Sequence, residues 1–104
     1  MIRKPALPAT LALLLSWLSP IAAHGDAATG ERLARQWCAN CHVIDKSGPA
    51  TTLQQGPPAF TIIAGHLDQD QMRSFLTHPH GAMPDLALTR AEIEDLIAYI
   101  ATLR

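Results

Sequence analysis

The chain has 104 residues, of which 48% are hydrophobic and only two are cysteines, so one small domain is expected and a multidomain enzyme is excluded. Eight basic and nine acidic residues give a net charge of −1, which argues against a nucleic-acid-binding protein. The charged fraction of 16% is too low for a solvated disordered tail, so a packed globular domain is expected.

The first 23 residues have the pattern of a cleaved secretory signal peptide. Arg3 and Lys4 make the start basic, residues 11–18 are largely apolar, and Ala22 and Ala23 precede the predicted cleavage site. An uncleaved membrane anchor is the alternative, but the apolar stretch is short and prolines flank it. We therefore expect a signal peptide over residues 1–23, a secreted domain over residues 24–104, and no stable membrane insertion after cleavage.

The secreted region contains six basic and nine acidic residues, which give a net charge of −3. A domain of this size gains only marginal stability from its side-chain core. A disulfide, a metal or a cofactor is therefore expected to support the fold.

The first predicted helix covers residues 27–37. Gly30, Leu33, Ala34 and Trp37 recur at helical spacing, and Asp26 is a candidate N-cap. This helix leads directly into the motif that carries the chemistry.

The segment Cys38-Ala39-Asn40-Cys41-His42 is typical of covalent attachment of a c-type haem. Two cysteines three residues apart on a helical turn can form thioethers to the two vinyl groups on one edge of a porphyrin. His42 directly follows and is then placed at one face of the iron. The sequence therefore predicts one haem c, bound through Cys38 and Cys41 and ligated by His42.

Three other kinds of site fit this motif less well. A Cys38–Cys41 disulfide would close a very short loop and leave His42 unexplained. A thioredoxin-like redox motif needs a preceding strand, whereas a helical pattern precedes this one. A structural zinc site would need further cysteines or paired histidines.

The second axial ligand is predicted to be Met83. Met72 lies on the apolar face of a predicted helix with Phe75 and Leu76, which favours a role in the core. Met83 instead lies in a segment rich in proline and glycine, where a large apolar residue needs a partner, and Pro84 restricts its backbone. The remaining candidates are the histidines His24, His66, His78 and His80.

The rest of the chain predicts further helices and no convincing strand, so an all-α domain is expected. Residues 59–64 can form a turn or two, and Asp68 with Gln71 can cap a helix that carries Met72. Thr89 and Glu92 form a capping box before the clearest helix, at whose C-terminal end Arg104 would lie. Its apolar stripe consists of Ile93, Leu96, Ile97, Ile100 and Leu103.

Three features in this order resemble the small monohaem class I c-type cytochromes of bacterial periplasms. They are the helix with Gly30 eight residues before the first cysteine, the Cys38–His42 motif, and Ala82-Met83-Pro84-Asp85 before a terminal helix. Together they span nearly all of the secreted region. The resemblance implies a small cytochrome c fold, in which the N- and C-terminal helices cross over a covalently bound haem.

The resemblance also implies particular contacts. Gly30 is expected to let the two terminal helices approach closely, with Tyr99 as its partner, and Trp37 is expected in the crossing or against the haem pocket. A proline carbonyl is expected to accept a hydrogen bond from His42, and Pro57 and Pro58 are both candidates.

The function expected is electron transfer, not enzyme catalysis. The protein would be a monomeric periplasmic carrier that exchanges single electrons with redox proteins such as respiratory complexes, oxidases or dehydrogenases. Two alternatives stay open, namely a haem-based redox or gas sensor with a labile Met83, and a tightly bound electron-accepting subunit of a dehydrogenase. His66, His78 and His80 are expected to be surface histidines.

Overall fold

A computed structural model describes residues 2–3 and 25–104. The predicted signal peptide lies outside these residues, apart from Ile2 and Arg3. In the part that is described, no helix is long and apolar enough to cross a membrane.

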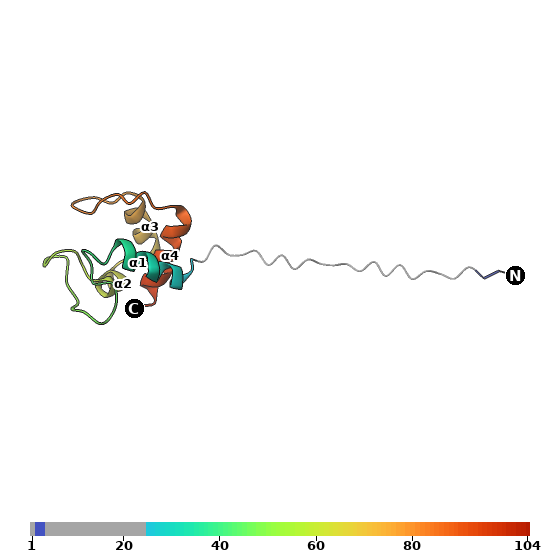
Figure 1. Cartoon of the computed structure of the whole chain (residues 1–104), viewed down its shortest axis with the longest axis horizontal. Coiled ribbons are helices and arrows are strands. Elements are labelled where there is room, and N and C mark those ends of the chain that lie inside the picture. The colour runs from blue at the N-terminus through green and yellow to red at the C-terminus, as the bar shows by residue number, and fades with distance from the viewer. Residues whose placement is uncertain (1, 4–24) are drawn as a thin grey trace.

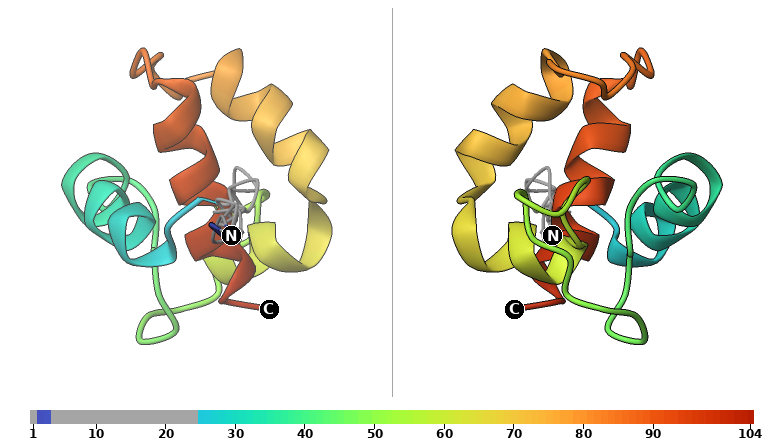
Figure 2. Two further views of the ribbon diagram at one scale, coloured as in Figure 1. Left: turned by 90° about the vertical axis from the view of Figure 1, so that its right-hand side faces the viewer. Right: turned by 90° about the vertical axis from the view of Figure 1, so that its left-hand side faces the viewer.

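The described residues form four α-helices and no strand, which confirms the predicted all-α class. In chain order they are α1 (Ala27–Trp37), α2 (Phe60–His66), α3 (Gln69–Thr77) and α4 (Arg90–Ala101) (Figure 1). The last helix packs against all three others, most extensively against α1. Figure 2 shows α4 in the middle, with α1 on one side and α3 on the other.

The two terminal helices cross at a glycine. A Cβ atom built on Gly30 would lie 1.9 Å from the carbonyl oxygen of Asp95 and 2.9 Å from the Cβ of Tyr99. No larger side chain fits there, because the backbones of α1 and α4 are in contact. The predicted pairing of Gly30 with Tyr99 is therefore confirmed.

The helix starts follow the caps predicted from the sequence. Thr89 and Glu92 form a complete capping box at α4, Asp68 and Gln71 form one at α3, and Asp26 caps α1 through the backbone N–H of Thr29. Each cap satisfies backbone donors that the first turn of a helix leaves free. Local sequence therefore determines where these three helices begin.

The core lies along the apolar stripe of α4. Four of the five predicted stripe residues are buried, namely Ile93, Leu96, Ile97 and Ile100. Leu103 lies just beyond the end of α4 and is partly buried against this core. Arg104 is also beyond the helix, with Nη2 3.5 Å from the carbonyl oxygen of Leu67.

An ion pair joins α3 to α4 outside the core. The Arg73 guanidinium donates two hydrogen bonds to the Glu94 carboxylate, at 2.5 and 3.1 Å, and a third to Asp70 at 2.7 Å. Bidentate geometry fixes the orientation of both side chains. This pair therefore holds α3 in place against α4.

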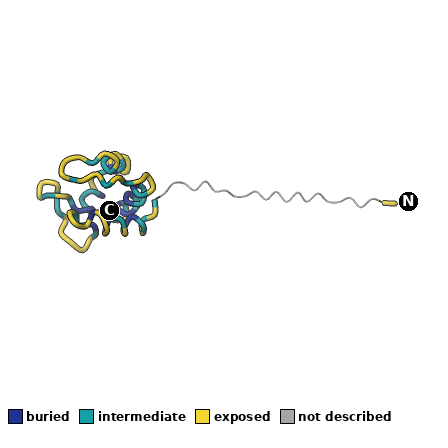
Figure 3. The backbone as a smooth tube through the Cα atoms, turned by 45° about the horizontal axis from the view of Figure 1, so that its top comes forward, coloured by how far each residue is buried: buried dark blue, intermediate teal, exposed yellow. Residues whose placement is uncertain are grey.

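Two long connections extend from this helical core. One covers residues 38–59 and contains the Cys38–His42 motif, and the other covers residues 78–89 and contains Met83. Both are mostly exposed, as the burial colouring in Figure 3 shows. Because the predicted haem ligands lie on these connections, the contacts that anchor each connection determine the site.

Candidate haem site

The two cysteines lie on the turn that follows α1. The backbone N–H of Cys38 donates to Ala34 at 2.9 Å, and the N–H groups of Cys41 and His42 both donate to the carbonyl oxygen of Cys38, at 3.1 and 2.9 Å. The chain therefore keeps a helix-like turn through the motif, as the predicted attachment geometry requires.

Both thiols are free, and they differ in exposure. Cys38 is 7% exposed, whereas Cys41 is an exposed residue. Burial raises the pKa of the Cys38 thiol, because a thiolate loses hydration there. The disulfide alternative is not formed in the structure.

The ring of His42 is oriented by the backbone of the same connection. Its Nδ1 lies 2.6 Å from the carbonyl oxygen of Pro58, and its ring centroid lies 5.5 Å from that of Phe60. With the proton on Nδ1, this ring nitrogen donates to Pro58 and the lone pair of Nε2 is free for a metal. Of the two prolines left open by the sequence, Pro58 makes the contact.

The two residues after His42 are also held by hydrogen bonds. The backbone N–H of Phe60 donates to the carbonyl of Val43 at 2.8 Å, and the Tyr99 hydroxyl donates to the carbonyl of Ile44, also at 2.8 Å. Tyr99 is buried, and this burial raises the pKa of its hydroxyl. The middle and last thirds of the chain are thus joined next to His42.

The two methionines of the domain occupy different environments. Met72 is 2% exposed and belongs to the core, which confirms the role predicted for it. Met83 is partly buried on a connection that is mostly exposed, between Gly81 with φ of 75° and Ala87 with φ of 50°. The backbone N–H of Ala87 donates to the carboxylate of Asp85 at 2.8 Å, which stabilises this turn after Met83.

Trp37 does not lie in the helix crossing, which is one of the two positions predicted for it. It is 51% exposed and is not among the residues that pack against the core, so its expected place in the helix crossing is wrong. Its spacing puts it on the same face as Gly30 and Ala34, but it is the last residue of α1. A place against the haem pocket stays a prediction.

Three histidines outside the motif lie at the surface, as predicted: His66, His78 and His80 are all exposed. His24 lies outside the described residues. The ring of His80 nevertheless contacts that of Phe75 edge-on, with centroids 4.8 Å apart and an interplanar angle of 78°. Sequence reasoning missed this contact, because nothing in the spacing of a loop residue indicates where its ring lies.

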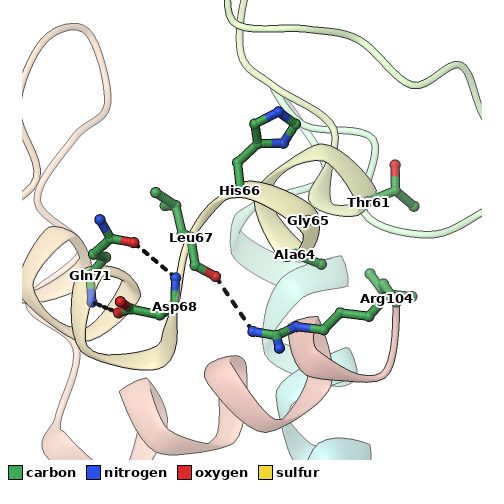
Figure 4. A pocket seen from close by; sticks show the side chains of 9 residues that line it. Thr61, Ala64, Gly65, His66, Leu67, Asp68, Gln71 and Arg104 are labelled. Atoms are coloured by element: carbon green, nitrogen blue, oxygen red, sulfur yellow. Dashed lines mark hydrogen bonds between the residues drawn. The ribbon is translucent and has the colours of Figure 1, made fainter.

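A separate groove lies at the junction of α2 and α3, where Figure 4 shows Thr61, His66, Gln71 and Arg104 among the residues that line it. The groove contains none of the four predicted haem-binding residues. Within the described residues, no three His, Cys, Asp or Glu side chains are grouped so that they could hold a metal ion.

The residues of the motif fit a covalently bound haem. Two unpaired thiols lie one turn apart, and the adjacent imidazole has one nitrogen engaged and the other available. This combination provides two points of covalent attachment and one nitrogen ligand. The fit rests on the contacts of His42 with Pro58 and on the free state of both cysteines.

Comparison with known proteins agrees with this fold and with a covalently bound haem. The family described as "Cytochrome C oxidase, cbb3-type, subunit III" matches residues 25–100, and this chain belongs to that cytochrome c family. It is a small monohaem class I c-type cytochrome, an electron-transfer protein and not an enzyme, with covalently bound haem c. Its Cys38 and Cys41 have the spacing of the attachment motif.

Two relatives carry cytochrome names. Cytochrome c-552 of Bradyrhizobium diazoefficiens is 38% identical over 96 residues, which cover 90% of each chain. Cytochrome c2 of Pararhodospirillum photometricum is 45% identical over 38 residues, which cover 36% of this chain and 31% of the relative. No solved structure gives a significant match. The predicted resemblance to c-type cytochromes is confirmed.

Proposed function

We propose that residues 24–104 form a periplasmic carrier of single electrons, whose haem is attached through Cys38 and Cys41 and ligated by His42 and Met83. The observation that carries this proposal is the 2.6 Å contact between Nδ1 of His42 and the carbonyl of Pro58, next to two free thiols. A hydrogen bond at Nδ1 orients the ring and makes Nε2 a better donor to a metal.

Each group of the site has a distinct role in this proposal. The cysteines prevent loss of a cofactor that so small a domain cannot enclose completely. The bound haem supplies a one-electron couple, whose potential depends on the axial ligands and on burial. His42 and Met83 would both ligate the iron, which would leave no position open to a substrate. Electron transfer then needs little rearrangement.

Two observations support Met83 as the sixth ligand. The side chain is partly buried although its neighbours Ala82 and Pro84 are exposed, and the alternative methionine, Met72, is enclosed in the core. A proline after Met83 disfavours helical backbone at the methionine and limits the directions its side chain can take.

The periplasmic location rests on the signal-peptide pattern of residues 1–23. The family match begins at Gly25, so these residues lie outside the cytochrome domain. Gly25 itself is packed against α4, because a Cβ built on it would lie 1.9 Å from the carbonyl oxygen of Glu94. Cleavage after Ala23 would therefore leave the packed domain intact. The intact mass of the exported protein tests this cleavage site.

The partners would be redox proteins that dock briefly with a monomer. Cys41 is exposed, so the edge of a haem bound to it would be close to the surface. A net charge of −3 for residues 24–104 provides no strong field for steering, which favours a small and transient docking surface.

Attachment of the haem is tested by expression in a periplasm that matures c-type cytochromes. The wild-type chain should retain one haem through denaturation and acid extraction, as measured by intact mass and by the haem spectrum. A Cys38→Ser Cys41→Ser double variant should lose all covalent haem. His42→Ala should disrupt the site, whereas His66→Ala, at an exposed histidine in α2, should leave it unchanged. Covalent haem on the double variant would contradict the proposal.

A further inference from the structure

The segment that leads from α3 to Met83 has few anchors. The backbone N–H of His78 donates to Ser74 at 3.0 Å and ends α3, and the next hydrogen bond along the chain joins Ala87 to Asp85. Among the described residues, residues 79–84 make no hydrogen bond or ion pair to other parts of the domain, and their one ring contact is between His80 and Phe75. Figure 2 shows this connection at one end of the α3–α4 pair, where it passes from one helix to the other.

Phe75, the residue that the His80 ring contacts, lies on a helix that is firmly held in the domain. Phe75 is partly buried on α3, between the core residue Met72 and the C-terminal end of the helix. The Arg73–Glu94 ion pair attaches the same helix to α4. A ring that rests on Phe75 is therefore held relative to the whole helical core.

His80 is placed to transmit this restraint to Met83. Only Gly81 and Ala82 separate the two residues, and Gly81 turns the chain with φ of 75°. Fixing the His80 ring restricts the positions that the Met83 side chain can reach, because so short a connection has few conformations.

We propose that His80 is a positioning residue, which acts through Phe75 to keep Met83 at the haem iron. The inference rests on the proposed function, since it assumes that Met83 is the axial ligand. Without the ring contact, the 79–84 segment moves away from α3 more often, and the thioether leaves the iron more often. An edge-on ring pair contributes enough free energy for a roughly 2- to 12-fold change in that equilibrium.

The test is the binding of added imidazole to the ferric holoprotein. Imidazole can bind only when Met83 has left the iron, so the apparent affinity reports the fraction of displaced methionine. His80→Ala should raise this affinity by roughly 2- to 12-fold, and His80→Phe, which restores a ring, should bring it back toward the wild-type value. His78→Ala is the matched control, because His78 is exposed and makes no ring contact among the described residues.

A double-variant cycle with Phe75→Leu separates positioning from general destabilisation. If His80 acts through Phe75, the two substitutions together should raise imidazole affinity no more than either one alone. Unfolding of each holoprotein by denaturant is measured in parallel. His80→Ala should destabilise the holoprotein by no more than its gain in imidazole affinity accounts for, because only the ring contact with Phe75 is lost. Equal imidazole affinity in His80→Ala and wild type, or fully additive effects in the cycle, would overturn the inference.

Failure of the proposed ligand set has a different signature. If Met83 is not a ligand, Met83→Ala leaves the ferric spectrum and imidazole binding unchanged, and the positioning role falls with the ligand assignment. If Met83→Ala changes both while His80→Ala changes neither, the ligand assignment holds and the role of His80 alone is rejected.

Discussion

The hydroxyl of Tyr99 donates a hydrogen bond to the carbonyl oxygen of Ile44 at 2.8 Å, across 55 positions of the sequence. The donor belongs to the C-terminal helix, and the acceptor lies two residues after His42. The helix crossing and the haem-binding connection are therefore one structural unit. Stability of the crossing and geometry of the site should respond together to changes at Tyr99.

Tyr99→Phe removes only this hydroxyl, and it should lower the free energy of unfolding by roughly 1–2 kcal/mol, because the buried Ile44 carbonyl loses its donor. Thr77→Val is the matched control, since the Thr77 hydroxyl donates to the Arg73 carbonyl at the surface. That substitution should stay within about 0.5 kcal/mol. Denaturant unfolding of the two variant holoproteins measures both effects. Equal decreases in the free energy of unfolding would show that the buried hydrogen bond contributes no more to stability than the surface one.

The helices were predictable because their signals are local. The capping boxes at Thr89 and Asp68 and the apolar stripe of α4 are determined by residues three or four positions apart. The attachment motif is local in the same way, so five residues are enough to predict its cysteines and its histidine. Comparison with the cytochrome family agrees with the predicted fold and with a covalently bound haem c.

The contacts that hold the connections were not predictable from spacing. Pro57 and Pro58 were equivalent candidates in the sequence, and only the path of the chain places the Pro58 carbonyl at His42. The bond from Tyr99 to Ile44 and the ring contact of His80 likewise depend on irregular backbone, which no periodic pattern describes. The predicted position of Trp37 was partly wrong. Helical spacing gives the face of a helix on which a residue lies, but it does not show how far along that face the neighbouring helix extends.

Gly30→Ala should be among the most destabilising single substitutions in the domain. Its Cβ would overlap the carbonyl of Asp95 at 1.9 Å, so the α1–α4 crossing must separate. A loss of roughly 3 kcal/mol is expected, as for severe overpacking. Gly65→Ala is the control, because a Cβ there meets nothing within 4 Å and alanine favours the helix by about 0.5–1 kcal/mol. Thermal unfolding of both variants should therefore shift in opposite directions.

The Arg73–Glu94 pair should make stability depend on pH in a defined direction. The hydrogen bond from Arg73 lowers the pKa of the Glu94 carboxyl below its ordinary value of 4.5. Such a group stabilises the fold above its unfolded-state pKa and loses this effect as the pH falls through the lower folded-state value. Glu94→Gln should thus be less stable than wild type at neutral pH, and the difference should vanish in acid.

The control for this pH profile is Glu31→Gln, which removes the partner of Arg35 in an exposed pair on α1. Exposed pairs of this kind add little to stability, so its profile should follow that of wild type. Denaturant midpoints measured from neutral to acidic pH test both variants. A Glu94→Gln defect that persists unchanged in acid would show that the carboxyl contributes through packing and not through charge.

The two cysteines should react at different rates before haem is attached. Cys41 is exposed, whereas burial raises the pKa of Cys38 and leaves less of the reactive thiolate. Iodoacetamide should therefore modify Cys41 several-fold faster than Cys38 in the haem-free chain, and neither cysteine in the holoprotein. Peptide mass spectrometry gives both rates. Equal rates in the haem-free chain would contradict a folded turn around Cys38 before attachment.

The most direct test of the account is the near-infrared spectrum of the ferric holoprotein, in which a thioether ligand gives a weak sulfur-to-iron charge-transfer band. We expect the band in wild type, its loss in Met83→Ala, and its retention in Met72→Leu, which alters only the core methionine. A wild-type spectrum without the band, or a band that survives Met83→Ala, would contradict the carrier ligated by His42 and Met83.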